Sequence, residues 1–250
     1  KPLLRGLHHV LQIPGVGRDV DKPVPFKEGA HRGVPLQGEG VHRLLAEKRP
    51  AGGVQSAFEG NGAFAVPVSV FGNRNFDNGL IELRNELELH GFHTIAAAGI
   101  PTEHVFSNKL ATGRPDADDL AKIAEFGEKV AKKVADITEI PAKIEVRGDD
   151  PVTAYYTPLG TDGKPAVFLK AKPKTDPEKC TKCGICATVC PMGSIPKDAP
   201  DTCTGICIKC HACIKACPAG AKYFDDEAFL SHVEMLKQNY QRRAEAEWFI

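Results

Sequence analysis

Two short apolar runs lie in the middle of the 250-residue chain. Residues 63–71 and 92–98 are rich in strand-forming side chains and are bounded by turn residues. Each run therefore predicts a buried strand. Pro67 lies inside the first run and argues against a central position in the sheet, because proline has no N–H for the hydrogen-bond ladder.

A helical pattern follows each of these runs. Residues 80–89 carry leucine and isoleucine at helical spacing and stop before Gly91, a typical C-terminal residue. Asp116 is a favourable N-cap for a second helix, whose expected apolar face is Leu120, Ile123, Ala124, Val130 and Val134. The order strand, helix, strand, helix predicts an α/β fold with a parallel sheet.

The segments that follow have a different composition. Residues 139–175 are rich in proline, which predicts a semi-rigid linker or a plain surface connection. Residues 225–250 are charged and predict a C-terminal helix packed on a neighbouring domain. The apolar positions of that helix are Phe229, Val233, Leu236 and Tyr240.

Composition and charge exclude several classes of protein. Hydrophobic residues make up 42% of the chain, so it can bury a core. Lysine plus arginine equals aspartate plus glutamate at 32 each, which argues against nucleic-acid binding as the main role. No run of apolar residues is long enough to predict insertion into a membrane. Residues 1–57 hold one Phe and no Tyr, Trp or Cys, and they stay an unassigned, atypical segment.

All nine cysteines lie between Cys180 and Cys217. The pattern C-x2-C-x2-C-x3-C-P begins at Cys180 and again at Cys207, an offset of 27 residues. Gly193 and Gly220 repeat at the same offset. Such clustering is typical of metal binding in a reducing compartment rather than of disulfides, and the repeat predicts two copies of one small unit.

Thiolates are soft ligands that suit iron–sulfur clusters, and in this pattern the fourth cysteine ligates the other cluster. The first [4Fe–4S] cluster is therefore assigned to Cys180, Cys183, Cys186 and Cys217, and the second to Cys190, Cys207, Cys210 and Cys213. The alternative is zinc held by two C-x2-C pairs. Zinc sites, however, need neither the third cysteine of each run nor the trailing Cys-Pro.

Three further residues belong to the cysteine-rich segment. Cys203 is left over, either as a small buried apolar residue or as a spare ligand or redox-sensitive thiol. Lys209 and His211 lie inside the second run and are interpreted as solvent-facing or potential-tuning residues rather than ligands.

Residues 176–224 resemble bacterial two-cluster ferredoxins, which implies a one-electron carrier with a small α+β domain.

Three stretches, residues 71–77, 102–105 and 111–116, look like the C-terminal half of a flavodoxin-like domain. Together they resemble bacterial fusions of a flavodoxin-like domain, here residues 58–138 and incomplete, to a dicluster ferredoxin. This resemblance implies FMN bordered by Gly72, Asn73, Arg74 and Phe76. The alternative is a strand–helix loop without flavin, because the phosphate-binding loop of a flavodoxin is absent. One hypothesis is that residues 1–57 are not the normal sequence of the family.

The leading functional hypothesis is an electron-transfer protein with two [4Fe–4S] clusters, coupled or not to FMN, and with a redox protein as its partner. The alternative is an FMN-dependent oxidoreductase fed by its own ferredoxin domain. A third hypothesis is a structural or regulatory iron–sulfur module. No residue pattern for substrate turnover is visible, so a carrier is favoured over a stand-alone enzyme. The cysteines and the oxygen-sensitive cofactor suggest the cytoplasm of an anaerobic bacterium.

Overall fold

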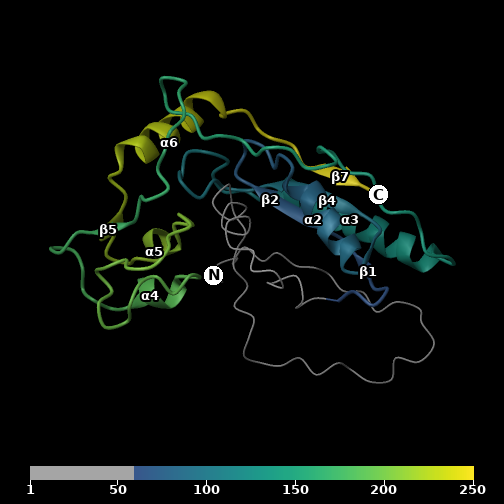
Figure 1. Cartoon of the computed structure of the whole chain (residues 1–250), viewed down its shortest axis with the longest axis horizontal. Coiled ribbons are helices and arrows are strands. Elements are labelled where there is room, and N and C mark those ends of the chain that lie inside the picture. Colours follow the sequence, from purple (N-terminus) through teal and green to yellow (C-terminus); the bar gives the residue numbers. More distant parts are fainter. Residues whose placement is uncertain (1–58) are drawn as a thin grey trace.

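The computed structural model describes residues 59–250, so the hypotheses about residues 1–57 lie outside it. Its elements gather in two parts (Figure 1). The part on the right of the view holds the sheet formed by β2 (Val68–Phe71), β4 (Ala97–Pro101) and β7 (Glu247–Phe249), with helices α2 (Gly79–Leu89) and α3 (Ala117–Asp136). The part on the left holds the cysteine-rich segment with the short helices α4 (Ile185–Val189) and α5 (Ala212–Lys215), and helix α6 (Glu227–Asn239) lies above it.

Strands form at both predicted apolar runs, and the second of them extends beyond its run to Pro101. The first run gives β1 (Phe64–Ala65) and β2 (Val68–Phe71), and the second gives β3 (His93–Thr94) and β4 (Ala97–Pro101). The break between β1 and β2 falls at Pro67, the position at which no N–H is available for the ladder. The carbonyl of Pro67 still accepts the N–H of Ala98 at 3.0 Å, so the two runs stay paired across the break.

The sheets are small and mixed. β1 pairs with β3 and β2 pairs with β4, both in parallel, as the order of elements predicts. β7 (Glu247–Phe249) then joins the other edge of β4 in the antiparallel sense. The purely parallel, flavodoxin-like sheet expected from the sequence is therefore not what residues 59–250 form. The added strand β7 lies near the C-terminus, and the local hydrophobic pattern does not reveal that it pairs with β4.

Helices α2 (Gly79–Leu89) and α3 (Ala117–Asp136) cover opposite faces of the sheet. Ala96 and Ala98 pack in a core with Phe126 and Val130 of α3. Ala97 points the other way, because side chains alternate along a strand, and packs with Leu80 of α2. The alanines of this strand let both helices approach the sheet closely.

Helix α3 begins as predicted, but its buried face differs from the prediction. Asp116 is the N-cap and forms a capping box with Asp119. Leu120, expected in the core, is 49% exposed, whereas Phe126 and Val130 are buried. The buried stripe starts instead at Asp119, because the guanidinium of Arg114 pairs with that carboxylate inside the fold.

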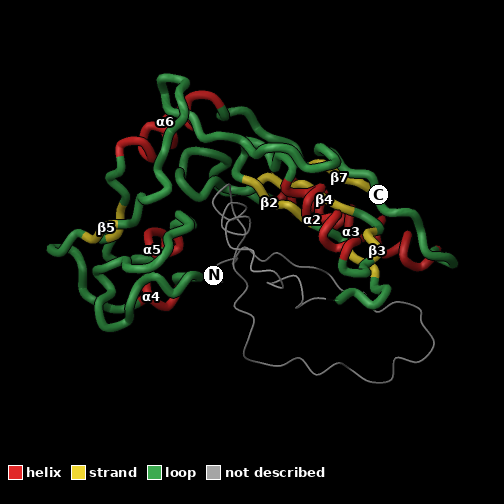
Figure 2. Tube along the Cα trace, viewed as in Figure 1, coloured by secondary structure: helices red, strands yellow, loops and turns green. Residues whose placement is uncertain are grey.

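The proline-rich linker is fastened to the α/β part rather than lying free on its surface. Arg84 of α2 is 1% exposed and donates to the carbonyl of Ile144 at 3.0 Å and to Asp150 at 3.3 Å. The N–H of Ile144 in turn donates to the carbonyl of Thr94. A buried arginine that donates to linker groups fixes the course of this segment toward the cysteine-rich part (Figure 2).

The C-terminal segment is not the single helix that its pattern predicts. α6 runs over Glu227–Asn239, and the chain then crosses back to the α/β part as a loop and ends in β7 (Figure 1). Trp248 of β7 stacks near Phe126 of α3 at 4.9 Å between ring centroids. Among residues 59–250, no helix combines the length and the apolar character that a membrane crossing requires.

We expect Asp119→Asn to lower the free energy of unfolding by about 3 kcal/mol at neutral pH, because it leaves the buried Arg114 charge without its partner. Urea unfolding of the anaerobic protein measures this loss. The Arg114 guanidinium holds the pKa of Asp119 below its ordinary value. The stabilisation is therefore complete above the unfolded pKa, and the difference between the two proteins narrows as the pH falls below about 4.

Glu125→Gln is the matched control on the same helix. Glu125 pairs with Lys129 at 2.7 Å, but both side chains are more than half exposed. This change should lower the free energy of unfolding by less than about 0.5 kcal/mol. Equal effects of the two substitutions would show that the Arg114–Asp119 pair has no special role in the fold.

Candidate iron–sulfur centre

The 27-residue repeat of the sequence is also a repeat of the backbone. Helices α4 (Ile185–Val189) and α5 (Ala212–Lys215) begin at equivalent positions of the two runs. Lys182 and Lys209 both have a left-handed backbone, with φ of 54° and 56°. Gly184 and His211 occupy the next equivalent left-handed position, with φ of 75° and 56°. Each run thus turns in the same way around the space that its cysteines face.

The two Cys-Pro turns are equivalent as well. The N–H of Ser194 donates to Sγ of Cys190, and the N–H of Ala221 donates to Sγ of Cys217, both at 3.3 Å. Gly193 and Gly220 complete the two turns with φ of 60° and 59°. These positive φ angles are the physical reason for the repeated glycine. Hydrogen bonds from backbone N–H groups stabilise a thiolate that ligates a metal.

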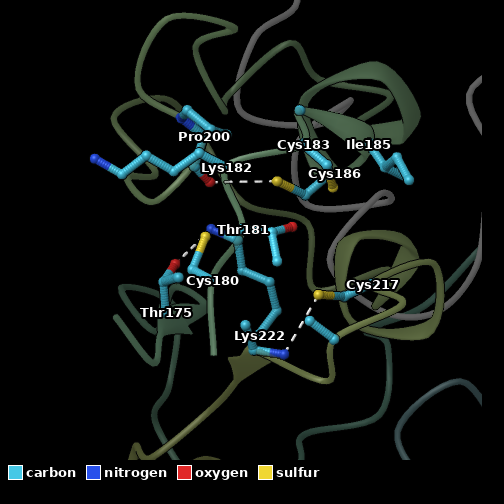
Figure 3. A pocket seen from close by; sticks show the side chains of 13 residues that line it. Thr175, Cys180, Thr181, Lys182, Cys183, Ile185, Cys186, Pro200, Cys217 and Lys222 are labelled. Atoms are coloured by element: carbon cyan, nitrogen blue, oxygen red, sulfur yellow. Dashed lines mark hydrogen bonds between the residues drawn. The ribbon is translucent and has the colours of Figure 1, made fainter. Parts of the chain in front are cut away.

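The first cavity brings together Cys180, Cys183, Cys186 and Cys217, the four cysteines assigned to one cluster (Figure 3). It encloses about 320 Å³, part of it open to solvent. Cys183 is exposed and Cys186 is buried, so one side of the cavity reaches the surface. Cys217 reaches this cavity from the second run, five residues before the short strand β6 (Lys222–Tyr223). β6 pairs with β5 (Lys174–Thr175) at the entry to the first run.

The second cavity spans about 360 Å³, part of it open to solvent, and brings together the other assigned cysteines. These are Cys190, Cys207, Cys210 and Cys213. Cys203 also lines this cavity and packs beside Cys190 in the apolar cluster of α4 and α5. The same apolar cluster contains Cys186 and Cys213, one from each cavity, so the two cavities lie next to each other.

Burial acts strongly on the thiols of the second cavity. It raises the pKa of Cys207 and Cys210, and it raises the pKa of Cys213 to about 12. Burial also tends to raise the pKa of Cys217, but the N–H groups of residues 219–222 outweigh it and leave this pKa below its ordinary value. Because a metal binds the thiolate, loading of these sites must release protons.

The residues around both cavities fit a cluster with sulfur ligands. Each cavity presents the four assigned cysteines, and backbone N–H groups face the sulfurs of Cys190 and Cys217. His211 lines the second cavity, and its Nε2 is buried without a hydrogen-bond partner among residues 59–250. A sulfur acceptor in the cavity would satisfy that nitrogen. In the same residues no three metal-ligating side chains are close enough to hold a single metal ion.

Lys209 and His211 do not face solvent, so that part of the interpretation is wrong, whereas a role in tuning the potential stays a prediction. Lys209 is 8% exposed, and its Nζ donates to the carbonyls of Leu169 and Cys207. His211 stacks on Phe224 and lies 5.2 Å from the ring of Phe106 in the α/β part. Burial lowers the pKa of His211 to about 4, so its ring is neutral at pH 7. The sequence around His211 could not reveal its burial, because its neighbour Phe106 lies more than 100 residues away in the sequence.

The four residues predicted to border FMN are all held by the chain itself. The His104 ring lies where a side chain on Gly72 would be, 2.6 Å from the position of a Cβ. Asn73 donates to the carbonyls of Tyr240 and Arg242 at 2.7 Å. Arg74 pairs with Asp77, and Phe76 packs on Gly99 under the guanidinium of Arg147. This loop therefore joins the sheet to the segment after α6.

Comparison with protein families identifies the cysteine-rich segment. A family model described as a 4Fe-4S binding domain matches residues 173–195, and a second model with the same description matches residues 200–220. No curated protein matches the chain. Residues 173–220 thus contain two ferredoxin-type 4Fe–4S binding domains, which favours iron–sulfur clusters over the zinc alternative. The flavodoxin resemblance of the α/β part stays a prediction.

Proposed function

We propose that this chain is an electron carrier with two [4Fe–4S] clusters, each ligated by three cysteines of one run and the fourth cysteine of the other. The observation that carries the proposal is the position of Cys217 in the first cavity and of Cys190 in the second. Two 4Fe–4S domain matches over the same residues give the chemical identity. Such clusters supply one-electron transfer without proton transfer or bond breaking.

The residues of the chain provide a route for electrons between the two centres. Cys186 and Cys213 pack in one apolar cluster with Ala187 and Ile195, so the two ligand sets adjoin. One electron enters from a reduced redox protein and one leaves to an oxidised partner, which balances the transfer. The exposed Cys183 lies on the open side of the first cavity, and we place the partner contact there.

The proposal includes no flavin step. The residues that the resemblance assigns to FMN make contacts within the chain, as Asn73 does with the segment after α6. The oxidoreductase alternative has no other observation in its favour. The cytoplasmic location and the anaerobic bacterial source stay predictions of the cysteine usage and the cofactor.

We expect the anaerobically purified or reconstituted chain to hold about eight iron and eight sulfide per molecule and to be reduced and reoxidised reversibly. Iron and sulfide analysis and electron paramagnetic resonance (EPR) of the dithionite-reduced protein measure this. About one zinc per molecule with no sulfide would contradict the proposal. Clusters that cannot be reduced and reoxidised would instead favour the structural or regulatory module.

Exchange of the fourth ligand has its own test. Cys217→Ser should abolish the same EPR signal as Cys183→Ser, although the two residues lie in different runs. Cys190→Ser should abolish the other signal, as Cys210→Ser does. Cys203→Ser is the control and should keep both signals. If Cys217→Ser abolishes the signal that Cys210→Ser abolishes, the fourth ligands are not exchanged.

Flavin binding is tested separately. After incubation with FMN and desalting, we expect the denatured protein to release far less than one flavin per chain, because Gly72 and Asn73 face residues of the chain itself. Fluorescence of the released flavin measures this. A yield near one flavin per chain would restore the flavodoxin-like interpretation and the oxidoreductase alternative.

A further inference from the structure

A buried lysine borders the first cavity. Lys222 is 4% exposed and lines the cavity together with its four cysteines. It lies in β6, directly opposite Thr175 of β5 in the register of that strand pair. Figure 3 shows its side chain beside this cavity. Lys222 lies at this cavity because it begins β6, five residues after Cys217, the cysteine that the second run contributes to the first cavity.

The ammonium group of Lys222 has little compensation from the protein. Its Nζ donates to Oγ1 of Thr175 at 2.6 Å. Within residues 59–250 it forms no ion pair with a carboxylate, whereas the neighbouring Lys174 pairs with Asp225 at 2.7 Å. A buried charge of this kind is unfavourable unless an opposite charge lies close by. Among the described residues that line the cavity, the cysteine sulfurs are the groups that become negative when they ligate a metal.

The internal repeat provides a comparison within the same chain. The residue 27 positions before Lys222 is Ile195, which is 4% exposed and lines the second cavity. The same place in the two pseudo-equivalent sites is thus filled by a cation in one and by an alkyl group in the other. Because the uncharged side chain of Ile195 fills the equivalent place, the charge of Lys222 is a feature that the second site lacks at this position.

Lys222 lines the same cavity as the four cysteines, so its charge acts on the negative charge that this site holds when it is loaded. Four thiolates outweigh the positive charge of the iron–sulfide core, so each loaded site is negative and becomes more negative when reduced.

We propose that Lys222 is a positioning residue whose buried charge raises the reduction potential of the first cluster relative to the same site with a neutral side chain. A nearby cation stabilises the reduced state more than the oxidised state, because the reduced state carries one more negative charge. The inference rests on the proposed function. It adds that the two clusters are unequal and that the solvent-facing one is tuned to accept the electron.

The test is an anaerobic redox titration followed by EPR, with the first signal identified by its loss in Cys183→Ser. Lys222→Ile copies Ile195, which fits the equivalent site, so this variant is expected to fold. We expect it to make the potential of the first cluster more negative and to move the second cluster less. Lys222→Arg keeps the charge and should stay close to the original protein. Lys174→Ile removes an exposed lysine from the adjacent strand and should change neither potential appreciably.

Each other outcome has a defined meaning. An unchanged first potential in Lys222→Ile, or an equal shift in Lys174→Ile, would overturn the inference. If Lys222→Ile loses the first cluster and Lys222→Arg keeps it, the first site requires the positive charge at position 222, which supports the inference. Loss from both variants would show that side-chain shape decides, and the inference fails. If the original protein binds no clusters, the proposed function itself is wrong, which is a separate result.

Discussion

The exchange of one cysteine between the two runs is the constraint on which the cysteine-rich part depends. Cys217 completes the cavity of the first run and Cys190 that of the second, so neither site is complete without the other. Helices α4 and α5 have four or five residues each, too few for an independent core. In the proposed function, metal binding at exchanged ligands supplies folding free energy in addition to the small apolar cluster around Cys186 and Cys213.

Departures from the repeat show where the two sites differ in chemistry. At the left-handed position Gly184 is replaced by His211, a conformation that is unfavourable for a residue with a Cβ. Its ring packs between Phe224 and Phe106, which offsets that strain and ties the second site to the α/β part. Ile195 of the second site corresponds to Lys222 of the first site in the repeat, and Lys222 places a charge at the first site. The sites share a backbone and differ in polarity.

The sequence alone predicted features that depend on neighbouring residues, and it missed features that depend on contacts between distant parts of the chain. The apolar runs predicted the strand positions, and Asp116 predicted the start of α3, because both depend on neighbouring residues. The antiparallel addition of β7 depends on Trp248 meeting Phe126 across more than 100 residues, which no local period encodes. The cysteine spacing predicted the grouping around each cavity because the repeat itself encodes it. The burial of Lys209 and Lys222 depends on tertiary contacts that spacing does not show.

The return of the chain from α6 to the sheet determines how the two parts are held together. Asn73 binds the carbonyls of Tyr240 and Arg242, and Arg242 donates back to the carbonyl of Asn73 at 2.9 Å. At the other end, Phe106 packs on His211 and Phe229, and Lys215 pairs with Glu103 at 2.9 Å. The proline-rich linker and the C-terminal segment thus cross between the parts in opposite directions. The loop after β2 contributes to this joint, so a flavin there would have to displace contacts between this loop and the segment after α6.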